Sequence, residues 1–418
     1  MALAAWLRGH SFRGSVRVQA TSAADMRRHR QRSLERPPGV ASTYAALGLH
    51  QSEWSARIPR GRRCSGAFYR PEDSTVVVCG DTLRDLAPRR ITHADNMLTT
   101  IGITALANIA LPGASLYVEY GEGQHRLAEA RRREAEHTLV HEFVHALQHQ
   151  RLGLTEAPRK LTTDEVEARL ALVEGDAAFV SWAMTLSRRG SRRPAPRASS
   201  AGFIVGLRES LREGAVSEGL PHEVARQLSF RYGDGLRLVS ELYRTWKWAA
   251  VDAAHFNPPS STSHVLHPMR YLDGAKPEAI AVPPVRVLES QGYQRVGTDT
   301  VGEFLLGSYV SAGGGGPLAA RQVGGWRGDQ IRVYSSPKGA PAAVWVSSFA
   351  DGEAAVTAHG AIAKAHARLP DELGSQAMLE RTGSRIVVAR GVPPDLHADL
   401  RSELARLLEP APPSEATP

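Results

Sequence analysis

The sequence predicts an α+β protein of two domains, in which a mostly helical domain with a small β-sheet precedes a smaller α+β domain. With 418 residues, of which 42% are hydrophobic, the chain is longer than one compact core usually serves. Helical patterns prevail up to residue 275, whereas strands and helices mix after residue 300. We expect an arginine-rich segment at 1–40, the helical domain at 41–275, a linker at 276–300, the C-terminal α+β domain at 301–409 and a disordered tail at 410–418.

Short strands and helices are expected at the start of the chain. A strand at 15–19 precedes a polar helix, which ends before the turn at 37–39. A further helix follows at 43–49. Residues 66–78 predict two strands joined by a turn, because Pro71 and the polar residues after it favour a turn.

Two long helices are predicted in the middle of the chain. Residues 124–151 are charged in their first half and apolar in their second, as in a helix that enters a core. Thr162 or Thr163 can cap the next helix, which reaches residue 186 and has carboxylates in its first turn. The other elements expected here are a helix at 95–110, a strand at 114–120, an exposed basic loop at 188–200, and helices at 203–213, 221–228 and 235–254.

The C-terminal part combines both kinds of element. Residues 275–300 are rich in Pro and Val without a clear period, which indicates a connection between domains. Beyond them the sequence predicts a helix at 301–311, strands at 330–334 and 342–348, a helix at 353–368, a strand at 385–389 and a helix at 394–408.

The charge of the chain does not indicate a nucleic-acid-binding protein. Its formal charge is +8 and its pI is near 9.7, but the excess arginines are scattered through Gly- and Pro-containing sequence. Neither a recognition helix nor an aromatic RNA-binding motif is present. No run of about 18 apolar residues occurs, so no membrane span is expected.

The N-terminus and the cysteines bear on localisation. The apolar run of residues 2–7 is too short for a secretion signal and has no basic residue before it. If the true start lies upstream, we expect a secreted or cell-envelope protein, and otherwise a cytoplasmic one. Cys64 and Cys79 can form a disulfide in an exported chain, or be small half-buried hydrophobes in a reducing cytosol.

The motif His-Glu-x-x-His at 141–145 is the strongest chemical signal. On a helix, residues four apart lie on one face, about 6 Å apart along the axis, so the imidazoles of His141 and His145 can bind one Zn²⁺ ion. Glu142 projects beside such a metal. A zinc site that keeps one open position for water needs a third protein ligand and a carboxylate that takes the proton of that water.

The third ligand is expected on the second long helix. Glu174 follows His145 after 28 intervening residues and is flanked by apolar residues, where an uncompensated carboxylate is costly to bury. Glu167, seven residues earlier on the same face, and Asp164 are the alternatives.

Other polar residues near the motif are not expected to bind the metal directly. His137 and His149 extend the ladder of histidines, but each four-residue step turns about 40° around the helix, so they cannot join the inner pair at one metal. Asp176 can orient a ligand imidazole by a hydrogen bond, or be a surface residue.

Acyl transfer also needs a donor for the developing oxyanion. His267 and Tyr271 are the candidates, and His267 is preferred as a second catalytic residue. The aromatic residues Tyr243, Trp246 and Trp248 have helical spacing, which favours a place in the core over a substrate platform.

These segments together resemble the gluzincin branch of the zincin metallopeptidases. More narrowly, they resemble uncharacterised bacterial proteins that carry a His-Glu-x-x-His helix, a Val-Glu-Gly-Asp-Ala segment and a Leu-His-Pro-x-x-Tyr segment. Here these are residues 141–145, 173–177 and 266–271, and the resemblance continues into 325–334.

The resemblance implies a zincin-like domain at 41–275 that holds one Zn²⁺ through His141, His145 and Glu174, with Glu142 as general base and acid. One position departs from the better-known gluzincins, which often have an aspartate four residues after the ligand glutamate. Ala178 stands there in this chain, so that supporting contact is missing.

The function expected from the sequence is a zinc-dependent peptidase that acts on a peptide or protein. In it, Glu142 activates a zinc-bound water for attack on a peptide carbonyl. The alternative is a catalytically inactive zincin-like protein that binds metal and a partner. A third reading, binding to nucleic acid through the arginines, predicts a steep dependence on salt.

Overall fold

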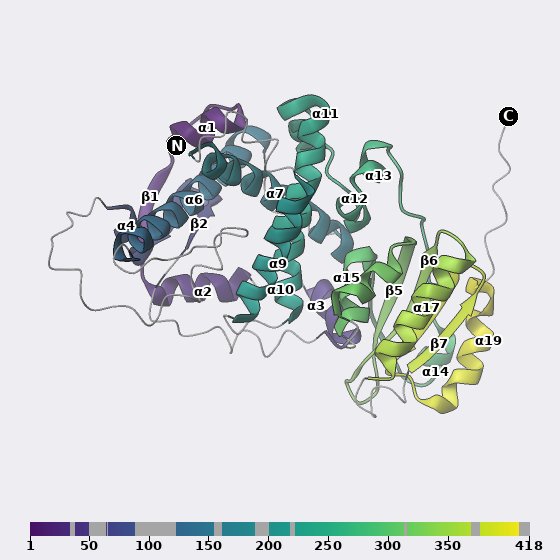
Figure 1. Ribbon diagram of the computed structural model, residues 1–418. Helices are drawn as coiled ribbons and strands as arrows, with labels where there is room; N and C mark the ends of the chain where they lie inside the picture. The colour runs from purple at the N-terminus through teal and green to yellow at the C-terminus, as the bar shows by residue number, and fades with distance from the viewer. Residues whose placement is uncertain are drawn as a thin grey trace. The chain divides into compact units, whose positions relative to one another are not determined.

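The computed structural model shows a mixed α and β protein in which helices prevail over two small sheets (Figure 1). This confirms the coarse fold class predicted from the sequence. The chain forms two compact units, of which unit 1 is Met1–Glu35, Trp54–Pro158 and Arg169–Pro259, and unit 2 is Arg36–Glu53, Arg159–Ala168 and Ser260–Pro418. Within them, the structure describes residues 1–33, 38–49, 64, 66–87, 123–153, 161–188, 200–217, 222–312, 316–368 and 377–408.

Unit 1 contains a three-stranded sheet in the order β1-β3-β2. The central strand β3 (Thr75–Cys79) is buried along its whole length and consists largely of valine, which favours a strand. β1 (Arg17–Thr21) pairs with it in parallel and β2 (Ala67–Arg70) in antiparallel. A single 3₁₀ turn at Pro71–Asp73 joins β2 to β3, as the turn residues predict.

Helices make up the rest of unit 1. The apolar half of α6 (Gly123–Leu152) packs on the sheet, where Val144 and Leu147 share one core with Val76 and Val78. The predicted bounds of this helix, 124–151, differ from the observed ones by one residue at each end. The other helices are α1 (Ala2–Arg8), α2 (Ala23–Ser33), α4 (Gly80–Leu86), α9 (Ala201–Ser217), α10 (His222–Leu228), the π-helical turn η4 (Ser229–Asp234) and α11 (Gly235–Phe256). The long helix α7 (Thr163–Arg188) belongs to unit 1 from Arg169 onward.

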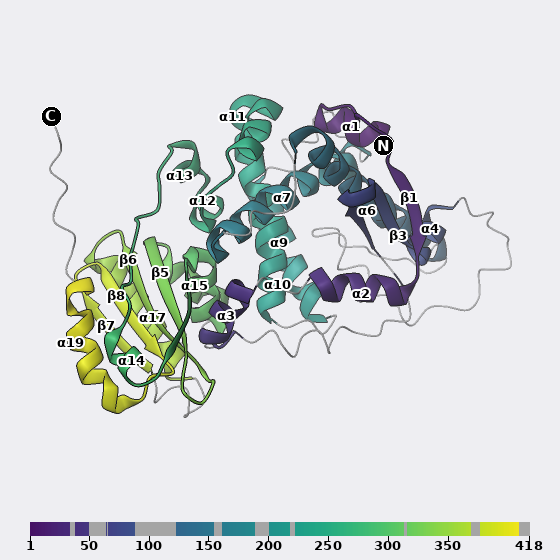
Figure 2. The ribbon, with the colours of Figure 1, turned by 180° about the vertical axis from the view of Figure 1, so that it is seen from behind.

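Unit 2 is built on an antiparallel sheet in the order β4-β5-β6-β8-β7. Alternate residues of β6 enter two different cores: Ala343 and Trp345 face one, and Val344 and Val346 face the other. Helix α17 (Gly352–His366) covers the first face and α19 (His397–Leu408) the second, as Figures 1 and 2 show from opposite sides. The strands are β4 (Gln294–Asp299), β5 (Trp326–Ser335), β6 (Pro341–Phe349), β7 (Ala377–Thr382) and β8 (Arg385–Arg390).

The helices of unit 2 are shorter. They are α3 (Pro38–Ala46), α12 (Thr262–Leu266), α13 (Pro268–Leu272), α14 (Arg286–Ser290), α15 (Gly302–Val310), α16 (Gly316–Ala319), α17 (Gly352–His366) and α19 (His397–Leu408), with 3₁₀ turns η6 (Ala320–Val323) and η7 (Pro394–Leu396).

Several sequence-based expectations have a different outcome. Residues 276–300, expected to be a linker, contain α14 and the edge strand β4 of the unit 2 sheet. The helix expected at 235–254 breaks at Lys247, whose φ is 56°, and Trp246 beside it is 72% exposed rather than part of the core. The elements expected at 95–110 and 114–120, the loop at 188–200 and the tail at 410–418 lie essentially outside the described residues.

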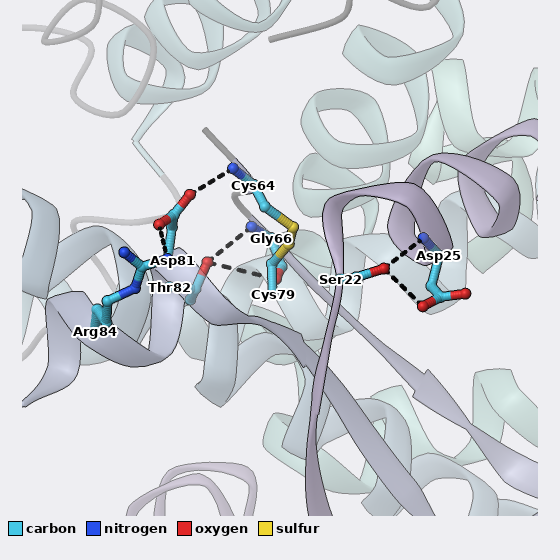
Figure 3. The surroundings of a disulfide bond; sticks show 8 residues. All are labelled: Ser22, Asp25, Cys64, Gly66, Cys79, Asp81, Thr82 and Arg84. Carbon is cyan, nitrogen blue, oxygen red and sulfur yellow. Dashed lines mark hydrogen bonds and ion pairs between the residues drawn. A yellow bond between two sulfur atoms is a disulfide. The ribbon is translucent and has the colours of Figure 1, made fainter. Parts of the chain in front are cut away.

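Cys64 and Cys79 form a disulfide in unit 1 (Figure 3). Cys79 ends the buried strand β3, and the backbone N–H of Cys64 donates to Asp81 at 2.7 Å. The bond therefore fastens the segment before β2 to the start of α4.

Among the described helices, none has an apolar stretch of sufficient length to span a lipid bilayer.

Candidate metal centre

His141 and His145 lie on one face of α6 in unit 1. Their imidazole Nε2 atoms are 3.0 Å apart and their rings are nearly perpendicular, at 86°. This is the convergence that the four-residue spacing predicts. The helix turns apolar just before the motif, so the two rings sit at the edge of the unit 1 core, with side chains 9% and 16% exposed.

Glu174 on α7 faces the same pair of imidazoles. Its Oε2 lies 3.1 Å from Nε2 of His141 and 3.4 Å from Nε2 of His145. Within the part of the chain that the structure describes, these residues form the one group of His, Cys, Asp and Glu side chains arranged to hold a metal ion. Ligand atoms bound tetrahedrally to zinc at 2.0–2.1 Å are separated by about 3.3 Å, so the observed spacing of the donor atoms matches such a site.

The side-chain amide of Gln148 determines which ring nitrogen of His145 carries the proton when the imidazole is neutral. Its side-chain N–H groups donate to the carbonyl oxygen of Val173 and to Asp176, each at 3.0 Å. The amide oxygen must therefore face His145, whose Nδ1 lies 2.8 Å away and donates to it. In the neutral imidazole, the form that binds a metal, this tautomer directs the lone pair of Nε2 at Glu174 and His141.

Asp176 anchors this arrangement from a completely buried position. Besides Gln148, its carboxylate contacts Nε of Arg8 at 2.8 Å and Nε2 of His255 at 3.0 Å. Although burial raises the pKa of a carboxyl group, the Arg8 charge and the His255 hydrogen bond hold the pKa of Asp176 well below its usual range. Asp176 thus acts on His145 through Gln148 rather than by direct contact.

The charges within the cluster shift one another's protonation. Burial alone would lower the pKa of His145, but the nearby carboxylates of Glu174 and Glu142 raise it to about 9. Burial alone would raise the pKa of Glu174, but His145 and His141 hold it well below its usual range. The site therefore stabilises a carboxylate next to positive charge, which is the electrostatic character of a cation site.

Glu142 is buried beside the cluster without being one of its three donors. Burial raises the pKa of Glu142, while the charges of His145 and His141 act in the opposite direction. The backbone N–H of Tyr69 in strand β2 also donates to this carboxylate. Glu142 is thus held between the imidazoles and the edge strand of the sheet.

Tyr232 is a further member of the site that the sequence patterns did not indicate. It lies in the π-helical turn η4, its ring stacks on His141 at a centroid distance of 5.5 Å, and its hydroxyl bonds Glu174. Burial and the charges of Glu174 and Glu142 raise the pKa of Tyr232 well above its usual value. The hydroxyl therefore keeps its proton at neutral pH and can donate a hydrogen bond.

A close helix crossing brings Tyr232 to the metal ligands. A Cβ built on Gly175 of α7 would lie 2.2 Å from the carbonyl carbon of Gly235 in α11, so the two helices meet backbone to backbone. Glu174 precedes the first glycine by one residue and Tyr232 precedes the second by three. The glycine of the Val-Glu-Gly-Asp-Ala segment thus permits the approach of the two helices.

The remaining candidates have other surroundings. His267 belongs to unit 2, where its Nε2 contacts Oε1 of Glu303 at 2.6 Å. Asp164 and Glu167 are also counted with unit 2 and are buried, and Asp164 accepts a hydrogen bond from the backbone N–H of Thr262. On α6, half-buried His137 contacts the ring of Trp182, and His149 bonds the hydroxyl of Tyr69 at 2.9 Å.

Arg8, Gln148, Tyr232 and His255 were not singled out from the sequence. Gln148 alone carried a local signal, since it follows His145 by three residues on the same helical face. The other residues reach the site from distant parts of the chain, so no spacing pattern could have indicated them.

Comparison of the chain with protein-family models, with curated proteins and with solved structures finds no match. The chemistry of the cluster therefore has to be inferred from its geometry.

Proposed function

We propose that this protein is a zinc-dependent peptidase. The observation that carries the proposal is the set of three donor atoms on His141, His145 and Glu174, separated by 3.0, 3.1 and 3.4 Å. Two imidazoles and one carboxylate are a donor set that catalytic zinc prefers. Zinc bound there supplies a Lewis acid that polarises a carbonyl group and lowers the pKa of water.

Glu142 is the proposed general base and acid. Its carboxylate takes a proton from the attacking water and then passes that proton to the amine that leaves when the peptide bond breaks. The support for this role is its position next to both imidazoles and its burial, which raises its pKa. Such a carboxylate is a better proton acceptor than one in water.

Two neighbours of Glu142 favour a peptide as the substrate. In the described part of unit 1, β2 pairs on one side only, with β3, and the N–H of Tyr69 on its other side reaches Glu142. Backbone groups of alternate residues face the same side, so Ala67 offers its own N–H and C=O to an extended peptide. The neutral hydroxyl of Tyr232, which bonds Glu174, is the proposed donor to a developing oxyanion once Glu174 binds the metal, a role for which the sequence suggested His267.

The test combines metal analysis with proteolysis by purified full-length protein. We expect about one zinc per chain, and cleavage of an unfolded protein such as reduced casein. Glu142→Gln should keep the zinc and lose at least about 1000-fold in kcat/KM, because the base is gone. His141→Ala and Glu174→Gln should lose the zinc.

Glu129→Gln on the exposed part of α6 is the matched control and should change neither quantity. Glu167→Gln separates the two candidate third ligands, since it should retain the zinc. Absence of zinc from the wild type, or proteolysis that survives Glu142→Gln, contradicts the proposal. Zinc without any proteolysis would instead favour a metal-binding interaction protein.

A further inference from the structure

Unit 2 contains a cavity of about 220 Å³ that is separate from the metal centre's residues. It lies between the short helices α12 and α13, the segment that follows them, and the start of β5. Three cationic side chains line it: Arg270, Lys276 and Arg327.

The side chains at this cavity carry more positive than negative charge. Arg270 pairs with Glu303 at 3.1 Å, and Glu303 is shared with His267. In the described residues, neither Lys276 nor Arg327 has a carboxylate partner, and the Arg327 guanidinium donates a hydrogen bond to the carbonyl oxygen of Trp326 at 3.4 Å. Burial lowers the pKa of Arg270, Glu303 opposes this, and the charge of Arg327 lowers it further.

The cavity also has an apolar wall. Ala275, Pro277 and the buried Trp326 line it together with the cations. The indole N–H of Trp326 is already used by Asp329, so its ring presents an apolar surface. A ligand that matches both parts has an apolar body and an anionic head.

Arg270 is held in place before any ligand arrives. Its guanidinium donates to the hydroxyl of Ser263, to Glu303 and to the carbonyl oxygen of Gly324. His264 holds another lining residue, because its Nε2 donates to the carbonyl oxygen of Ala275 at 2.7 Å. A charged group that is already oriented loses little side-chain entropy on binding.

We infer that this cavity of unit 2 binds a small organic anion, a carboxylate or phosphate on an apolar body, through Arg270, Lys276 and Arg327. Guanidinium groups match the planar carboxylate and the phosphate equally, in each case by paired charge-assisted hydrogen bonds. The volume limits the ligand to one ring or a short chain, since most ligand cavities are larger. The inference is independent of the proposed peptidase activity.

The experiment is a calorimetric titration of full-length His141→Ala protein, in which a carboxylate cannot bind at the metal centre. The probes are benzoate, phenyl phosphate and the neutral benzamide. We expect one of the two anions to bind, and benzamide to bind at least about tenfold more weakly, because it lacks the charge. The anion that binds more tightly identifies the head group.

Variants of the two exposed cations localise the binding. Arg327→Gln and Lys276→Gln should each weaken it about tenfold. Arg381→Gln, an exposed arginine on β7, is the matched control and should have no effect. Unfolding curves verify that all variants fold. The inference is overturned if no anion binds at about 10 mM, if benzamide binds as tightly as the tighter of the two anions, or if the double variant Arg327→Gln/Lys276→Gln binds that anion as tightly as the protein without these two changes.

Discussion

The side-chain nitrogen of Gln148 lies 3.0 Å from Oδ2 of the buried Asp176, and this hydrogen bond orients the amide whose oxygen faces His145. Asp176 is itself held by Arg8 and His255. The tautomer of a candidate metal ligand is thus supported by residues of α1 and α11, which are not among the three candidate ligands themselves.

This chain of contacts predicts how zinc affinity responds to mutation. Gln148→Leu removes the acceptor for Nδ1–H of His145, so the imidazole loses its fixed tautomer. We expect the zinc dissociation constant to rise about 10- to 100-fold, as when such supporting partners are removed in other metal sites. Competition with a chromophoric chelator measures it. Gln150→Leu makes the same change on the same helix, where the side chain bonds Arg13 and Gly14 instead, and should leave the affinity unchanged. Equal affinities in both variants would contradict the role of Gln148.

The crossing of α7 and α11 predicts that Gly175 cannot be replaced. In Gly175→Ala the new methyl group overlaps the backbone of Gly235, so the helices must separate and move Glu174 and Tyr232 apart. We expect a loss of about 3 kcal/mol or more in the free energy of unfolding, typical of overpacking at a backbone contact, and weaker zinc binding. Gly202→Ala on α9 is the control, since no atom lies within 4 Å of its Cβ. It should be neutral or slightly stabilising. A Gly175→Ala protein as stable as wild type would show that the helices do not cross this closely.

Two buried aspartates in unit 2 predict a pH dependence. Burial raises the pKa of Asp164 to about 6 and that of Asp329 to about 7, and the charge of Asp164 adds to the rise at Asp329. Between pH 4 and 7 the folded state therefore binds protons that the unfolded chain has released, so stability is greatest at low pH and falls as pH rises. Since each tenfold change in proton affinity is worth about 1.4 kcal/mol, the rise of the pKa from 3.8 predicts a loss of about 3 kcal/mol from Asp164 and of about 4 kcal/mol from Asp329 over this range.

Urea unfolding from pH 4.5 to 8 measures this dependence, and the difference between wild type and Asp164→Asn isolates the contribution of Asp164. The asparagine does not ionise and keeps an acceptor for the N–H of Thr262, so its curve should be flatter. Asp395→Asn at an exposed position should follow the wild type. If Asp164→Asn has the same slope as wild type, Asp164 is ionised in the folded protein throughout.

The disulfide predicts a sensitivity of unit 1 to reduction. Cys64 and Cys79 close a loop with a sequence separation of 15, for which the lost entropy of the unfolded chain is worth about 3 kcal/mol. We expect dithiothreitol to lower the midpoint of thermal unfolding of the wild type. The variant Cys64→Ala/Cys79→Ala should start at the lower midpoint and not respond to the reductant. An identical midpoint with and without dithiothreitol in the wild type would exclude a stabilising bond.

Much of the fold followed from local patterns. The bounds of α6 agree with the prediction because the change from charged to apolar residues and the stop at Gly153 are read along one helix. The element β4 was missed because its residues are exposed and show no apolar alternation, so its pairing with β5 alone makes it a strand. The break in α11 at Lys247 was missed for a related reason: a helical period continues across it in the sequence.

The sequence by itself determined the pairing of His141 with His145, and placed Glu142 beside them, because a four-residue spacing on a helix is a local geometric fact. Only the tertiary structure decided that Glu174, 33 residues from His141, supplies the nearby carboxylate and that Tyr232 covers the site. Both depend on two helices that approach through Gly175 and Gly235. That approach is a property of packing between segments, which no periodicity within either segment encodes.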